Sequence, residues 1–197
     1  MWLFRPTFYI SDNNLQELCQ FAYKPYHSTE SALVKVHDDS LRHLDNQKSV
    51  ILLLLDLLEA SDTVDHNILM SLLKPRFGIN GIALDWFRSY LSSRTYTVTV
   101  LGGRSTERPL MAGVPQGSVL EPILSSMYTS PLGDVISLHD LSYHLYEDDT
   151  QLYVTVKITC PDYMNVVRSP IEVCIRDVGA WMACNKLKLN SIAKRNF

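Results

Sequence analysis

Three adjacent acids, Glu147, Asp148 and Asp149, follow Tyr146 and lie between two strand-like runs. A tight hairpin turn usually carries Gly or Asn, because these residues reach the positive φ that the turn needs. Two like charges ~4 Å apart repel by roughly 4 kcal/mol at an effective dielectric of about 20. A divalent cation would offset this repulsion, since hard cations prefer carboxylate oxygens. A solvated acidic turn is the simpler interpretation, and the pattern by itself leaves both open.

A fourth carboxylate, Asp56, follows the apolar run 50–55, which is continuous and therefore predicts a strand buried on both faces. A charge at the end of a buried strand needs a partner, because burying an unpaired ion is strongly unfavourable. Asp56 could cap the next segment or pair with an arginine. It could also meet the acids of the hairpin and share two metal ions with them, as in sites of phosphoryl transfer.

The other periodicities predict an α+β protein with strands and helices around one sheet. Helices are expected from residue 28 or 29 and over 65–77, 82–91 and 118–127. Another helix is expected to begin at Ser169, with Pro170 in its first position and Glu172 completing a capping box. Further strands are expected over 95–101, 105–111 and 186–189.

The composition is that of an ordinary globular protein, with 197 residues, 46% hydrophobic residues and a net charge of -3. This charge gives no support to a nucleic-acid partner. The four cysteines lie far apart and form no C-x-x-C pair, which argues against a zinc site and predicts an intracellular protein of the nucleus or cytoplasm that is not secreted. No apolar run approaches the ~20 residues that cross a bilayer, so we expect no membrane span.

Four ordered motifs resemble the palm of a reverse transcriptase. They are Asp56, Gly113-Val-Pro-Gln-Gly-Ser118, Tyr146-x-Asp-Asp149 and Trp181-Met-x-x-Asn-Lys-Leu-Lys-Leu-Asn190. More narrowly, these motifs and the stretches 26–33, 62–69 and 86–94 resemble the polymerase of non-LTR (LINE-type) retrotransposons over about residues 15–190. The resemblance implies a small antiparallel sheet of the split β-α-β (ferredoxin-like) kind, packed by helices on one face.

The resemblance implies that Asp56 and Asp148 hold two Mg²⁺ or Mn²⁺ ions, with Asp149 as a supporting acid. The implied reaction is RNA-templated DNA synthesis. Deoxynucleotides (dNTP) would be added to the 3′-OH of a DNA primer that is paired with an RNA template. Two metal ions would clamp the attacking and leaving oxygens.

Five more residues match positions that contact substrate in the family. Gln116 and Gly117 match the loop against the incoming nucleotide, and Tyr146 matches the aromatic that supports the primer end. Lys24 occupies a position where an arginine often faces the triphosphate, although Lys lacks the bidentate fork of Arg. Ser61 occupies the position of a bulky aromatic that is thought to exclude the ribose 2′-OH.

Three residues at the expected active site differ from those usual in the family. Glu147 replaces a small residue, Ser61 replaces the aromatic, and Glu121 replaces a glycine. Because of these changes, two other functions stay open beside catalysis. One is an inactive retrotransposon relic that keeps the palm and at most binds RNA or a cation. The other is an interaction module whose acidic hairpin binds one structural cation.

The family plan also predicts how the chain is divided. Residues 1–48 are expected to be partial fingers, and residues 49–190 the palm with a finger insertion around 62–112. Residues 191–197 would be a truncated tail, with the thumb outside this sequence. On this plan the chain would lack a thumb, which is a further argument against activity of this chain by itself.

Overall fold

The structure is a computed structural model that describes residues 6–58, 60–157 and 163–189. It forms two compact units, which we describe separately. The helical unit comprises residues 1–15 and 60–128, and the sheet unit comprises residues 16–59 and 129–197. The expected finger insertion falls within the helical unit. The structure divides the expected segment 1–48 after Leu15, however, and groups its larger part with the sheet.

The sheet unit is built on a four-stranded antiparallel sheet in the order β6-β7-β1-β8. Its strands are β1 (Lys48–Leu58), β6 (Ser142–Tyr146), β7 (Asp149–Lys157) and β8 (Lys188–Leu189). Its helices are α2 (Thr29–Asp45), α7 (Pro131–Ser137) and α8 (Tyr163–Cys184). The predicted α+β class with a small antiparallel sheet is confirmed.

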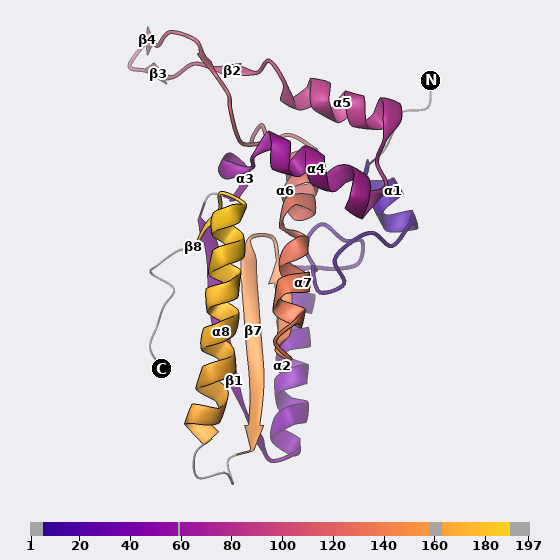
Figure 1. The fold of residues 1–197 in the computed structure, drawn as a ribbon, viewed down its shortest axis with the longest axis vertical. Helices are drawn as coiled ribbons and strands as arrows, with labels where there is room; N and C mark the ends of the chain where they lie inside the picture. The colour runs from indigo at the N-terminus through magenta and orange to yellow at the C-terminus, as the bar shows by residue number, and fades with distance from the viewer. Residues whose placement is uncertain (1–5, 59, 158–162, 190–197) are drawn as a thin grey trace. The chain divides into compact units, whose positions relative to one another are not determined.

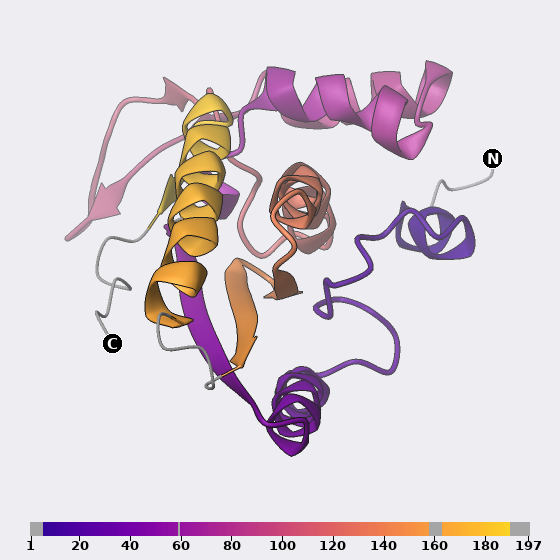
Figure 2. The ribbon, with the colours of Figure 1, turned by 60° about the horizontal axis from the view of Figure 1, so that its bottom comes forward.

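Helices α7 and α8 cover one face of this sheet, and α2 lies on the other, so helices flank both faces and not one alone as expected (Figures 1 and 2). The hydroxyl of Tyr153 on β7 donates to Asp39 of α2 at 2.7 Å, which shows that Tyr153 points toward α2. Leu52 lies directly opposite Tyr153, so Leu52 and Leu54 share that face. Leu152 points to the other face and is fully buried.

The expectation that residues 50–55 are buried on both faces is wrong. Leu52 and Leu54 are 37% and 56% exposed, because the face they share is covered only in part. A continuous apolar run does not distinguish a strand between two layers from a strand with one half-open face. The open face is the one that also carries Asp56, two residues beyond Leu54.

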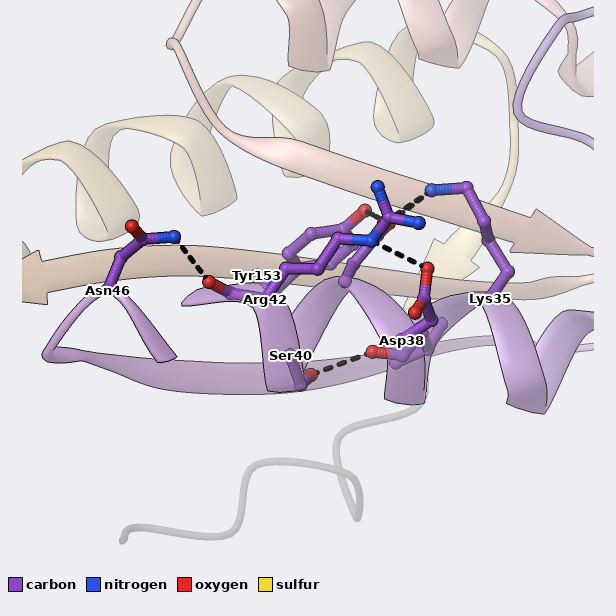
Figure 3. Close-up of polar contacts among 8 residues, drawn as sticks. Lys35, Asp38, Ser40, Arg42, Asn46 and Tyr153 are labelled. Carbon is purple, nitrogen blue, oxygen red and sulfur yellow. Dashed lines mark hydrogen bonds and ion pairs between the residues drawn. The ribbon is translucent and has the colours of Figure 1, made fainter. Parts of the chain in front are cut away.

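Helix α2 begins where the sequence predicts it. Ser28 is its N-cap and forms a reciprocal capping box with Ser31. On its exposed side Arg42 pairs with Asp38 at 2.8 Å, as Figure 3 shows. Such an exposed pair adds only about 0.3–0.5 kcal/mol. Helix α2 is joined to the sheet by the buried side chains of Ala32 and Val36 and by the hydrogen bond from Tyr153, which Figure 3 places beside the helix.

Helix α8 begins at Tyr163, so the predicted start at Ser169 is wrong. Pro170 lies inside the helix, and Glu172 accepts from Arg168 at 2.7 Å instead of completing a capping box. A proline within a helix removes one backbone hydrogen bond. Val167, in the turn before Pro170, is 4% exposed, and we attribute the extra turns to this burial.

The helical unit contains the remaining elements. They are α1 (Pro6–Asp12), α3 (Ala60–Thr63), α4 (His66–Phe77), α5 (Gly81–Leu91) and α6 (Glu121–Thr129), with short strands β2 (Thr95–Tyr96), β3 (Thr99–Val100), β4 (Gly103–Arg104) and β5 (Arg108–Pro109). The predicted helices over 65–77 and 82–91 are confirmed. The predicted strands 95–101 and 105–111 form only two-residue pairs with exposed side chains, because neither face of the hairpin is buried. No helix in the described part of the chain is both long and apolar enough to cross a membrane.

The core of the sheet unit contains a histidine, His144 on β6, which is 2% exposed and lies 4.0 Å from Phe21 between ring centroids. Among the described residues, neither of its ring nitrogens has a hydrogen-bond partner. Burial lowers the pKa of His144 from 6.5 to about 4. The charges that act on it are those of Lys24, His27, Lys35 and Asp39, and only Asp39 opposes the shift.

This histidine predicts a loss of stability in mild acid. Below pH 6.5 the unfolded chain binds a proton at His144 that the folded chain binds only near pH 4, so acid favours unfolding. Between pH 7.5 and pH 5 we expect His144 to reduce the free energy of unfolding by about 2 kcal/mol. Urea unfolding at both pH values measures this loss. His144→Leu should remove it, and His37→Leu on the exposed side of α2 should not. A pH dependence that survives in His144→Leu would contradict the assignment.

Candidate functional site

The register of the sheet brings the predicted carboxylates together. Asp56 on β1 is the direct partner of Asp149 on β7, and Asp149 is in turn the direct partner of Tyr146 on β6. Directly opposed residues project from the same face of a sheet. The three side chains therefore form one row across three adjacent strands, on the half-open face described above.

We expected Asp56 to lie at the end of its strand, and it does not. β1 continues to Leu58, because Leu57 and Leu58 pair with β8. The half-buried Asp56 thus sits within a strand that is paired with β7 on one side and β8 on the other. This position restrains its backbone more firmly than a strand end would.

The acids influence one another electrostatically. The pKa of Asp149 is raised, first by partial loss of its hydration and then by the negative charges of Asp56 and Glu147. A raised pKa in a carboxyl shows that its charged form is disfavoured where it stands. A bound cation would reverse this effect, since it would favour the charged form of every carboxylate around it.

The acidic turn consists of Glu147 and Asp148, which connect β6 to β7. Glu147 is exposed and has φ 52, which lies in the left-handed region. A residue with a Cβ pays about 1–2 kcal/mol there. The backbone of Glu147 is bonded on both its N–H and its C=O by the side chain of Gln20.

Two substitutions at Glu147 should separate its charge from its backbone strain. Glu147→Gly removes both, and we expect it to raise the free energy of unfolding by about 1 kcal/mol. Glu147→Ala removes only the charge and should leave stability nearly unchanged. Both should lower the pKa of Asp149, because one of the charges that raise it is gone. Urea unfolding and carboxyl NMR titration measure the two effects, and equal stability of the Gly and Ala variants would contradict the strain argument.

The row and the turn beside it carry carboxylates, which are the kind of ligand that Mg²⁺ and Mn²⁺ prefer. Within the described ranges, no three His, Cys, Asp or Glu side chains form a ready group that could hold a metal ion. Asp56 and Asp149 form a pair, and Asp148 precedes Asp149 in the turn. Mg²⁺ is usually bound by one or two carboxylates together with substrate phosphates and water, so a full cage of side chains is not required.

The Gly113–Ser118 loop of the helical unit is fixed against the segment that contains α3. Gly113 donates its N–H to the carbonyl of Val64 at 2.8 Å, and Val114 donates to the carbonyl of Ser61 at 2.9 Å. Nε2 of His66 lies 2.8 Å from the carbonyl oxygen of Gly113. Gly113 has φ 87, and a Cβ at this position would lie 2.8 Å from the carbonyl oxygen of Asp62. Only glycine fits such a position without strain.

Two acids hold the end of this loop. The side-chain amide of Gln116 donates to Asp62 at 2.8 Å, and the backbone N–H of Gly117 donates to Glu121 at 2.6 Å. Glu121 therefore has a structural role that a glycine there could not supply. Sequence reasoning did not single out Asp62, because its contact with Gln116 joins residues 54 positions apart.

Lys24 lies in the sheet unit and is held by the backbone that precedes it. Its ammonium donates to the carbonyl of Glu17 at 2.7 Å and to that of Leu18 at 3.3 Å. Burial lowers the pKa of this lysine. Its expected role toward a triphosphate stays a prediction.

Apart from Lys24, the predicted site residues thus fall into two sets. Asp56, Tyr146, Asp148 and Asp149 lie together in the sheet unit. Ser61, Gln116 and Gly117 lie together in the helical unit. The predicted tail, residues 191–197, lies outside the described residues.

Comparison with solved structures shows the fold. The chain is similar to telomerase from Candida albicans, solved in complex with a TWJ fragment of telomeric RNA, with a TM-score of 0.67 and 15% identity over 95% of this chain and 33% of that one. It is also similar to apo telomerase from Candida tropicalis, with a TM-score of 0.62 and 12% identity over 94% of this chain and 34% of that one. At such low identity these matches establish the architecture alone.

Comparison with sequences shows the family. The family described as "Reverse transcriptase (RNA-dependent DNA polymerase)" matches residues 6–193. The RNA-directed DNA polymerase from mobile element jockey of Drosophila melanogaster is 33% identical over 144 residues, which are 70% of this chain and 15% of that protein. The probable RNA-directed DNA polymerase from transposon X-element of the same fly is 36% identical over 115 residues, which are 56% of this chain and 12% of that protein. The chain spans less than a sixth of the length of either relative. Since the family match runs through nearly the whole chain and these polymerases share about a third of the aligned residues, the chain belongs to the reverse transcriptase family, among those of non-LTR retrotransposons.

Proposed function

We propose that this chain is the palm of an RNA-directed DNA polymerase, which adds deoxynucleotides to a primer 3′-OH opposite an RNA template. The observation that carries the proposal is the cross-strand pair of Asp56 and Asp149, with Asp148 in the adjoining turn. The reaction class is inferred from the family, and the position of the active site is inferred from this pair of carboxylates.

In this proposal Asp56, Asp148 and Asp149 hold two divalent cations, Mg²⁺ or Mn²⁺. When bound, these ions would stabilise the charge on the attacking and leaving oxygens of an in-line displacement. The contribution of the chain is to hold two of the carboxylates on paired strands and the third in the turn that joins β6 to β7. Tyr146, which pairs with Asp149 and lies on the same face, would support the end of the primer.

The other substrate contacts are assigned to the Gly113–Ser118 loop and to Lys24. Gln116 and Gly117 would lie against the incoming nucleotide, where the glycine backbone permits close approach. Ser61, whose carbonyl accepts from Val114 of this loop, would face the sugar. Since a serine is small, this site would discriminate poorly between ribose and deoxyribose. Lys24 would supply positive charge toward the triphosphate.

A second candidate function is cation or RNA binding without polymerisation. It is favoured by Glu147, an exposed acid beside Asp149 that raises the pKa of that residue. A further negative charge at this place should repel the phosphates of primer and nucleotide. The same charge would not prevent a cation from binding.

Primer extension by the full chain distinguishes the two functions. The assay uses a DNA primer annealed to an RNA template, deoxynucleotides, and Mg²⁺ or Mn²⁺ at low salt, since phosphate contacts weaken steeply as salt rises. Metal-dependent lengthening of the primer supports the polymerase. Mn²⁺ binding with no extension at any salt concentration would support the second function and refute the first for this chain. Absence of extension, of Mn²⁺ binding and of binding to the RNA template would refute both.

A further inference from the structure

A buried glutamine of the sheet unit, Gln20, holds the acidic turn. Gln20 is 6% exposed, although it lies in an irregular segment before α2. Its Nε2 donates to the carbonyl oxygen of Glu147 at 3.2 Å, and its Oε1 accepts from the N–H of Glu147 at 3.2 Å. Its Oε1 also accepts from the N–H of Ala22 at 3.0 Å, which fixes the amide within its own segment.

The side-chain amide of Gln20 lies beside β6, at the edge of the sheet. β6 is an edge strand, so alternate backbone groups of β6 point away from β7. The segment around Gln20 meets this edge at Leu145, whose N–H donates to Cys19 at 2.8 Å and whose C=O accepts from Phe21 at 2.9 Å. Two residues later the side chain of Gln20 provides the same pair of bonds to Glu147. A primary amide can do this because it carries both a donor and an acceptor, like a peptide group.

We propose that Gln20 is a positioning residue for the acidic turn. By bonding both backbone groups of Glu147, it keeps this residue in the left-handed conformation that leads the chain into Asp148. Without these two hydrogen bonds fewer contacts hold Glu147 at its strained positive φ, so the backbone of the turn can move to a less strained conformation. One part of this inference rests on the proposed function, namely that the acidic turn binds a cation and that this binding depends on Gln20.

Gln20→Met tests this proposal, because Met has a similar length but neither donates nor accepts strongly. We expect the amide hydrogen of Glu147 to exchange at least about tenfold faster in this variant. We also expect the full chain to bind Mn²⁺ about tenfold more weakly, as is typical when a partner behind a metal ligand is lost. Amide exchange by NMR and titration of free Mn²⁺ by electron paramagnetic resonance measure the two effects.

Two controls separate positioning from general damage. Gln47→Met makes the same change at an exposed glutamine between α2 and β1, and it should alter neither measurement. The amide of Leu145 is an internal reference, because it donates to the backbone of Cys19 and not to the side chain of Gln20. It should keep its protection in Gln20→Met. Equal acceleration at Leu145 would mean that the whole segment has detached, and it would overturn a role specific to the turn.

The possible failures can be told apart. If the unaltered chain does not bind Mn²⁺, the proposed cation site is wrong, and exchange at Glu147 still decides whether Gln20 holds the turn. If the unaltered chain binds Mn²⁺ and Gln20→Met binds it equally tightly, the positioning role is wrong. If exchange at Glu147 does not change in Gln20→Met, the inference is overturned whatever the cation does.

Discussion

Asp148→Asn is expected to reduce primer extension by at least about a thousandfold, which corresponds to roughly 4 kcal/mol of transition-state stabilisation. Asn keeps the size of the side chain but removes the charge that a hard cation requires. Asp56→Asn should have a similar effect. Asp56→Asn should also lower the pKa of Asp149, since the charge of Asp56 is one of those that raise it. Single-turnover extension of a labelled primer measures the loss.

The matched control for these variants is Asp45→Asn. Asp45 is exposed and is the last residue of α2. It precedes Lys48, the first residue of β1, whereas Asp56 lies near the opposite end of that strand. Asp45→Asn should keep the full extension rate. All three variants should remain folded, because each replaces a carboxylate by an amide of nearly the same shape, and circular dichroism can verify this. Retention of more than a tenth of the activity in Asp148→Asn would contradict its assignment as a metal ligand.

Gly113→Ala is expected to destabilise the helical unit by about 4 kcal/mol, which combines left-handed strain with overpacking against a rigid neighbour. The new Cβ would lie 2.8 Å from the carbonyl oxygen of Asp62, and backbone atoms cannot move aside as a flexible side chain can. The displaced segment would carry Asp62 away from Gln116, which it now binds at 2.8 Å. Urea unfolding measures the loss of stability.

Gly102→Ala separates the two causes of this loss. Gly102 has φ 82, close to the value at Gly113, but a Cβ there would meet no atom within 4 Å. We therefore expect it to cost only the backbone strain, about 1–2 kcal/mol. If both variants lose the same stability, the contact with Asp62 does not matter. If Gly113→Ala is as stable as the parent chain, the loop does not have the conformation described above.

Local chemistry made several elements predictable from the sequence. The start of α2 was predictable to residue 28 or 29, and Ser28 is the cap, because capping depends on residues within one turn. The helix over 65–77 was predictable from its apolar periodicity, and the structure adds that Asp65 is the N-cap, which accepts from the N–H groups of Asn67 and Ile68. Gly113 and Gly117 both have positive φ, which glycine reaches without strain, so glycine at these two loop positions has a local reason.

Burial was the main reason that local signals failed. The pattern from Ser169 to Glu172 has every feature of a helix start, yet α8 begins at Tyr163 and the turn before Pro170 buries Val167. The apolar run in β1 gave no sign that Leu52 and Leu54 lie on a half-open face. In both cases the outcome depends on which other elements cover the segment, and neighbouring residues in the sequence do not carry that information.

By itself the sequence determined the chemical inventory of this protein, namely which acids, glycines and caps exist and in what order they occur along a reverse transcriptase palm. Only the tertiary structure decided that Asp56 stands opposite Asp149, because strand register is set by the pairing of whole strands. It alone decided that Gln20 bonds the backbone of Glu147, 127 residues away. The physical reason is that the chemical groups of a residue are fixed by its type, whereas the residues that it contacts depend on how distant segments of the chain pack together.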